Sequence, residues 1–99
     1  MKNLNVQEFK NEISDNPKAV IIDVRTPEEK MEGDIENSIN LNIMDQAFPA
    51  KVMDLAKDQD YYVYCRSGAR SASACQFMEK LGLNAFNLEG GIQAWNASN

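Results

Sequence analysis

The stretch from Cys65 to Ser71 reads Cys-Arg-Ser-Gly-Ala-Arg-Ser, and it places a sulfur nucleophile beside positive charge. The apolar run 61–64 before it indicates a buried strand, and the segment 71–81 after it indicates an amphipathic helix. A loop between a strand end and a helix start can direct several backbone N–H groups to one point, where the helix dipole favours negative charge. Such surroundings lower the pKa of a cysteine and favour the nucleophilic thiolate.

The neighbours of Cys65 favour a functional role over a structural one. Arg66 and Arg70 bring two positive charges, and Gly68 allows the positive φ that turns N–H groups inward. Charged residues such as these arginines are rarely buried in a protein core. The alternative interpretation is a buried structural thiol at a strand end.

The spacing within this loop limits the chemistry. Four residues separate Cys65 from Arg70, whereas a cysteine phosphatase has one more residue between its cysteine and its arginine. Ser71 stands where that arginine would fall. The tighter loop suits a single extra sulfur atom better than a tetrahedral phosphate. A persulfide on Cys65 would be anionic at neutral pH and would need no separate base.

Composition excludes several classes of protein. The chain has 99 residues and no histidine, which rules out Cys-His and Ser-His hydrolases and histidine-containing metal sites. Two cysteines alone cannot form a zinc site, so we expect neither a metal nor another cofactor. A net charge of −5 argues against binding to nucleic acid or to an anionic membrane. With no signal-like or membrane-spanning apolar run, we expect one cytoplasmic domain over residues 1–99.

Short apolar runs alternate with amphipathic stretches along the chain. Capping-box patterns open two helices, one near Asn5 and one at Thr26. We predict helices over 6–14, 26–33, 49–56 and 71–81 with a short one after 91, and strands over 19–24, 39–43, 61–64 and 85–88, with 61–64 as the central strand.

This alternation predicts an α/β fold with one parallel sheet and helices on both of its faces. Ligands bind outside the carboxyl ends of the strands in such sheets, and Cys65 lies at one of these ends. Asp23 and Arg25 lie at another. They could touch substrate, but we interpret them as a structural pair that ties a strand end to the following helix or to the loop.

Four motifs follow one another along the chain: Ile21-Ile22-Asp23-Val24-Arg25-Thr26-Pro27-Glu28-Glu29, Gly33-Asp34-Ile35 with Ile39-Asn40, Cys65 to Ser71, and Glu89-Gly90-Gly91-Ile92 with Trp95. In this order and spacing they resemble a single-domain rhodanese, a sulfurtransferase. The resemblance covers nearly the whole chain. One departure is Asp34, where many members have histidine; the residue is outside the sulfur chemistry, but it alters the charge at the rim of the pocket.

The resemblance implies a five-stranded parallel sheet and a ping-pong reaction. The Cys65 thiolate would take sulfur from a donor such as thiosulfate, and an acceptor thiol or cyanide would then remove it. Backbone N–H groups of the loop, from Arg66 through Ser67, Gly68 and Ala69 to Arg70, would hold the persulfide. The two arginines would bind the anionic donor, with Arg70 also partly structural.

Two other functions stay open at this stage. One is a small cysteine phosphatase or arsenate reductase on the same fold, which the short loop argues against. The other is a non-catalytic rhodanese-like module that binds a partner, which would not need the cysteine and its cationic loop. We expect a monomer whose physiological acceptor could also be a protein.

Several further residues receive structural interpretations. We expect Cys75 to fill the core, too far from Cys65 for an unstrained disulfide, and Trp95 to pack on the core as a lid. Strand tyrosines 61, 62 and 64 are interpreted as packing residues. The acidic residues between 28 and 36 are interpreted as a solvated helix face; they are Glu28, Glu29, Glu32, Asp34 and Glu36.

Overall fold

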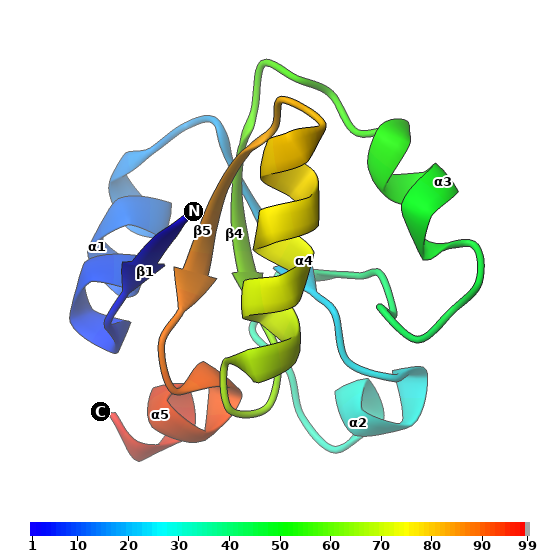
Figure 1. The fold of residues 1–99 in the computed structure, drawn as a ribbon. Coiled ribbons are helices and arrows are strands. Elements are labelled where there is room, and N and C mark those ends of the chain that lie inside the picture. Colours follow the sequence, from blue (N-terminus) through cyan, green and yellow to red (C-terminus); the bar gives the residue numbers. More distant parts are fainter. Residues whose placement is uncertain (99) are drawn as a thin grey trace.

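A parallel sheet of five strands organises residues 1–98, the part of the chain that the computed structural model describes (Figure 1). The strand order is β1-β5-β4-β2-β3, so β4 is central as predicted. The ten elements are β1 (Lys2–Leu4), α1 (Val6–Asp15), β2 (Ala19–Asp23), α2 (Pro27–Met31), β3 (Ile39–Asn40), α3 (Phe48–Met53), β4 (Asp60–Tyr64), α4 (Ala69–Lys80), β5 (Asn84–Leu88) and α5 (Gly91–Ala97). The predicted α/β class is confirmed.

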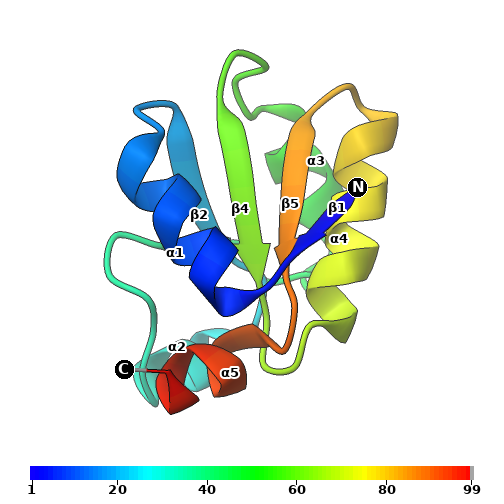
Figure 2. The ribbon, with the colours of Figure 1, turned by 90° about the vertical axis from the view of Figure 1, so that its left-hand side faces the viewer.

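Helices cover both faces of this sheet, which Figure 2 shows from the side of α1. Helix α1 lies in front of the strands in that view, and α3 and α4 lie behind them. The short helices α2 and α5 both lie at the end toward which the arrows of β4 and β5 point (Figures 1 and 2). The carboxyl ends of the strands are therefore flanked by α2 and α5.

Local sequence explains where two helices begin. Asn5 caps α1 and Thr26 caps α2, each in a complete capping box with the glutamate three residues later. Both predicted capping boxes are confirmed. Helix α4 begins at Ala69, two residues before the predicted start, because Gly68 at φ 106° already forms its N-cap.

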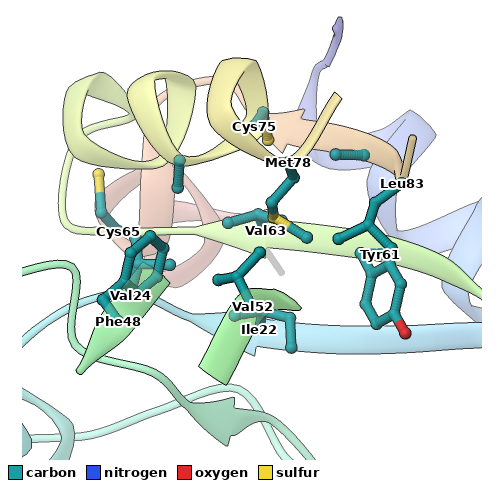
Figure 3. Close-up of a cluster of buried hydrophobic side chains, with 12 residues drawn as sticks. Ile22, Val24, Phe48, Val52, Tyr61, Val63, Cys65, Cys75, Met78 and Leu83 are labelled. Atoms are coloured by element: carbon teal, nitrogen blue, oxygen red, sulfur yellow. The ribbon is translucent and has the colours of Figure 1, made fainter. Parts of the chain in front are cut away.

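The core consists of two clusters, one on each face of the sheet. Figure 3 shows the cluster between the sheet and helices α3 and α4, which contains Cys65, Val63 and Cys75. The second cluster lies on the α1 and α5 side and contains Phe9, Tyr62 and Tyr64. Because successive strand residues face opposite sides, β4 supplies both clusters.

Three further elements differ from the predictions. Strand β1 was not predicted, because its three residues, two of them polar, are too few to show an alternation of apolar and polar side chains. Strand β3 has two residues rather than five. Helix α3 runs over Phe48–Met53 rather than 49–56, and it presents Val52 to the core while Met53 is 64% exposed.

The helices of the described chain are all short. The longest, α4, has 12 residues. Within residues 1–98, no helix has the length and apolar character that would let it cross a bilayer.

Candidate active site

The loop that carries Cys65 connects the central strand to α4. Cys65 follows the last residue of β4, and Gly68 turns the chain into α4. Only 1% of the Cys65 surface is exposed, so its sulfur lies inside the ring of the loop. Gly68 has φ 106° and a Cβ there would lie 3.3 Å from the backbone nitrogen of Gly90, so a side chain would be both strained and crowded.

Hydrogen-bond donors surround the sulfur of Cys65. The backbone N–H of Gly68 donates to Sγ at 3.1 Å, and the hydroxyl of the buried Ser71 donates at 3.3 Å. Burial by itself raises the pKa of the Cys65 thiol. The hydroxyl of Ser71 and the backbone N–H groups of Ser71, Gly68 and Ser67 outweigh burial, so the pKa lies below its ordinary value. The loop is therefore built to hold a negative charge on sulfur.

Helix α5 orients the first two peptide groups of the loop. The backbone N–H of Ile92 donates to the carbonyl of Cys65 at 2.9 Å, and that of Gln93 donates to the carbonyl of Arg66 at 3.2 Å. Since the described peptides are trans, each N–H that follows these carbonyls points away from α5. Gly91 makes this contact possible, because a Cβ there would lie 2.4 Å from the carbonyl oxygen of Arg66.

Two buried polar residues at the loop were not predicted from the sequence. Ser71 was noted only as the residue that replaces a phosphatase arginine, and its hydroxyl donates to the sulfur. Asn87 in β5 donates to the carbonyl of Gly68 at 3.3 Å and to the side chain of Asn3 at 2.9 Å. The available signal for Asn87 was a polar side chain between the apolar residues Phe86 and Leu88 of the strand.

Arg70 forms a bidentate ion pair with Glu29 of α2. Its two terminal nitrogens donate to the two carboxylate oxygens at 2.7 and 2.8 Å. These hydrogen bonds are the main cause that lowers the pKa of Glu29 to about 2. The interpretation of Glu29 as part of a solvated acidic face was wrong, because the loop supplies a partner from 41 residues away. The structure thus connects Arg70 to α2.

Arg66 is the exposed cation of the loop. Within residues 1–98 it has no ion-pair partner. Its side chain lines a cleft of about 190 Å³ between α2 and α5. The loop residues Ser67 and Ala69 are also exposed, and the structure shows no side-chain contact for Ala69 with the sulfur.

Asp23 and Arg25 form a buried pair at the end of β2. The guanidinium donates to the carboxylate at 2.8 to 3.2 Å and to the carbonyl of Gly33 at 2.7 Å. The hydroxyl of Tyr64 donates to Asp23 at 3.0 Å, and burial raises the pKa of Tyr64, so this hydroxyl stays protonated. The pair links β2, β4 and the segment after α2, which agrees with its structural interpretation.

The remaining candidates lie away from the sulfur. Cys75 is a free, fully buried thiol in the core, and burial raises its pKa to about 12. Trp95 packs edge-on against Phe9, with ring centroids 6.2 Å apart, on the opposite face of the sheet. In residues 1–98, no three His, Cys, Asp or Glu side chains are grouped as a metal site requires.

The fold and the loop together define a class of small α/β proteins with a hydrogen-bonded cysteine in the loop that follows the central parallel strand. Comparison with known families agrees with this class. The family described as "Rhodanese-like domain" matches residues 5–98. The chain therefore belongs to the rhodanese-like domain family, as the sequence motifs predicted.

Individual relatives are similar along most of their length. A protein of Allochromatium vinosum named "Sulfurtransferase" is 37% identical over 84 residues, which cover 84% of this chain and 77% of the relative. A rhodanese-related protein from Thermoplasma volcanium has a crystal structure with TM-score 0.89, 36% identity, and coverage of 100% of this chain and 94% of its own. A rhodanese-like domain protein from Staphylococcus aureus gives TM-score 0.85, 35% identity, and 96% and 91% coverage. These similarities support a transferase of the sulfurtransferase group.

Proposed function

We propose that this protein is a thiosulfate-type sulfurtransferase that carries sulfur as a persulfide on Cys65. The observation that carries the proposal is the set of hydrogen bonds to its sulfur, which comes from Gly68, Ser71 and Ser67. Each donor stabilises an anion, and none of them can act as a general base at neutral pH. A nucleophile that is already a thiolate suits a chain without histidine.

The first half-reaction loads the protein with sulfur. The Cys65 thiolate forms a bond to the outer sulfur of thiosulfate, and the sulfur–sulfur bond of thiosulfate breaks. Sulfite leaves with the electron pair of that bond, so no oxidant or base is needed. The resulting persulfide carries one negative charge, which the surrounding N–H groups stabilise.

The second half-reaction regenerates the thiolate. An acceptor such as cyanide or a thiolate attacks the outer sulfur of the persulfide. The bond to Sγ breaks, and its electron pair stays on Cys65. Because sulfite departs before the acceptor enters, the two substrates use the site in turn, which gives ping-pong kinetics.

The two arginines take different roles in this mechanism. Arg66 is exposed and unpaired among the described residues, so its guanidinium is available to an anionic donor. Arg70 is held by its ion pair with Glu29, so it positions the loop against α2. The negative charge of Glu29 offsets much of the positive charge of Arg70, so Arg70 attracts an anionic donor only weakly.

The proposal is tested by thiocyanate formation from thiosulfate and cyanide. We expect parallel double-reciprocal plots for the two substrates, and we expect Cys65→Ser to abolish turnover while Cys75→Ser retains it. The same preparations are assayed with p-nitrophenyl phosphate and arsenate. Activity on these substrates without thiocyanate formation would favour the phosphatase or arsenate reductase alternative, and no activity on any of them would favour a binding module.

A further inference from the structure

A cleft adjoins the loop that carries Cys65. The half-reaction with thiosulfate assigns no role to most of the residues that line it. The cleft has a volume of about 190 Å³ and lies between α2 and α5, the two helices beyond the carboxyl ends of the strands (Figures 1 and 2). Arg66 lines it, and so does Ile92, whose N–H donates to the carbonyl of Cys65. The cleft therefore begins at the residues in direct contact with the cysteine peptide.

The cleft presents free charges of both signs. Two of its charged residues, Arg25 and Glu29, are already occupied by the ion pairs described above. The other two, Arg66 and Glu32, are exposed and have no ion-pair partner in residues 1–98. One cation and one anion therefore remain available on the walls of the cleft.

Helix α5 adds two amides to the same walls. Gln93 and Asn96 are three residues apart, which places them on one face of the helix, and both line the cleft. Neither side-chain amide forms a hydrogen bond to another described residue. Each therefore has a free N–H donor and a free carbonyl acceptor for a ligand.

Thiosulfate and cyanide do not match this arrangement. Both are anions, and Glu32 would repel them while contributing nothing to their binding. The acceptor enters after sulfite has left, so Arg66 is free again when the second substrate binds. A ligand that uses both free charges must carry one anionic and one cationic group, and a carboxylate and an ammonium group are the simplest such pair on a small thiol.

We propose that the cleft between α2 and α5 binds the sulfur acceptor, and that this acceptor is a small thiol with both an ammonium and a carboxylate group. Its carboxylate pairs with Arg66 and accepts from the amides of α5, and its ammonium group pairs with Glu32. This inference rests on the proposed function. The acceptor sulfur then bonds to the outer sulfur of the persulfide, the bond to Cys65 breaks, and the electron pair returns to Sγ.

A panel of thiols tests this selectivity on protein that has been loaded with thiosulfate. The acceptors are cysteine, cysteamine, 3-mercaptopropionate and 2-mercaptoethanol, which carry both charges, the ammonium alone, the carboxylate alone, and neither. Rates of sulfur removal are divided by the thiolate fraction of each acceptor. We expect cysteine to exceed 2-mercaptoethanol by about tenfold. Equal rates per thiolate would overturn the inference.

Two glutamates of the same region provide a matched pair of variants. Glu32→Gln should lower the rates with cysteine and cysteamine by about fivefold, a factor typical of the stronger exposed ion pairs, and leave 3-mercaptopropionate unchanged. Glu28→Gln makes the same change of charge on α2 outside the cleft and should change none of these rates. Equal effects of both variants would overturn the inference in favour of a general effect of charge.

A binding measurement separates this inference from the proposed function. S-Methylcysteine carries both charges but cannot accept sulfur, and its titration is followed by NMR on the unloaded protein. We expect the amide signals of Glu32, Gln93 and Asn96 to shift in the wild type and in Glu28→Gln, and not in Glu32→Gln. Normal sulfur loading without these shifts would overturn the acceptor site alone. Shifts without any sulfur loading would overturn the proposed function alone.

Discussion

The local surroundings of one sulfur atom determine its charge. Burial of Cys65 favours the neutral thiol, and donors from Ser71, Gly68 and Ser67 favour the thiolate. The donors prevail, because hydrogen bonds to an anion are stronger than those between neutral groups. The core thiol Cys75 has burial without such donors, and its pKa is raised to about 12. The same side chain therefore has a lowered pKa at one position and a raised pKa at the other.

Ser71→Ala tests the contribution of the side-chain donor. The change removes one hydrogen bond to Sγ that favours the thiolate, so the pKa of Cys65 should rise. The measurement is the pH dependence of iodoacetamide alkylation at Cys65, followed by mass. Ser73→Ala, on the exposed side of α4, is the control and should leave the midpoint unchanged. An unchanged midpoint in Ser71→Ala would remove the hydroxyl from this role.

Arg66→Glu tests donor binding. Loss of the free guanidinium and the addition of a carboxylate should raise KM for thiosulfate by about tenfold or more, while circular dichroism shows an intact fold. Lys80→Glu, at the far end of α4 from the loop, changes the net charge by the same amount. If both variants shift KM equally, the effect comes from the total charge and Arg66 does not bind the donor.

Only part of the site could be predicted from the sequence. Cys65 and Gly68 were identified because the residues next to them in the sequence indicate a cationic loop between a strand and a helix. The ion pair between Arg70 and Glu29 depends on where the fold places α2 relative to the loop, since the two residues are 41 positions apart in the sequence. Asn87 likewise reaches the loop from another strand. Such contacts are properties of the tertiary structure, which local patterns do not encode.

Three elements hold the loop in place. Helix α4 carries its end, α5 binds the carbonyls of Cys65 and Arg66, and α2 is connected through Glu29. The two short helices α2 and α5 therefore position the site as well as bordering it. Their stability as elements depends on these contacts, since helices of this length are not stable alone.

Glu29→Gln tests the connection between α2 and α4. The pKa of Glu29 is about 2 in the folded protein, against about 4.3 in an unfolded chain. Its contribution is therefore full above about pH 5 and is lost as the pH falls toward 2. We expect the variant to be about 1 kcal/mol less stable at pH 7, with a smaller difference at pH 3, by urea denaturation. A difference independent of pH would contradict the ion pair, and Glu28→Gln is the matched control.

Gly91→Ala tests how α5 approaches the loop. The added Cβ would lie 2.4 Å from the carbonyl oxygen of Arg66, at a residue with φ 60°. We expect a loss of about 2 kcal/mol or more in stability and a slower alkylation of Cys65. In Gly33→Ala, the new Cβ meets nothing within 4 Å, so this control carries backbone strain alone. Equal losses in both variants would show that crowding at the loop is unimportant.

At the scale of the whole molecule, the net charge of −5 opposes the binding of an anionic donor. Screening reduces this opposition, because the Debye length at physiological salt is about 8 Å. The paired Arg70 adds little, so the local attraction comes mainly from Arg66 and from the N–H groups of the loop. The sheet concentrates these groups at one end of the central strand, which is the place that parallel α/β folds use for ligands.

The overall architecture was more predictable than its edges. Apolar runs such as 19–24 and 61–64, which alternate with amphipathic stretches, predicted a parallel α/β sheet and its central strand. Strand β1 is recognised only through its pairing with β5, where Leu4 lies opposite Leu88. A long apolar run can be predicted as a strand from its own residues. A strand of three residues forms because of the strand that it pairs with, so its own residues do not predict it.

The intact mass of the protein after incubation with thiosulfate tests the central claim most directly. We predict a gain of one sulfur atom in the wild type and in Cys75→Ser, no gain in Cys65→Ser, and loss of the added mass when cyanide is supplied. A wild-type mass that stays unchanged, or a gain that persists in Cys65→Ser, would contradict a persulfide on Cys65.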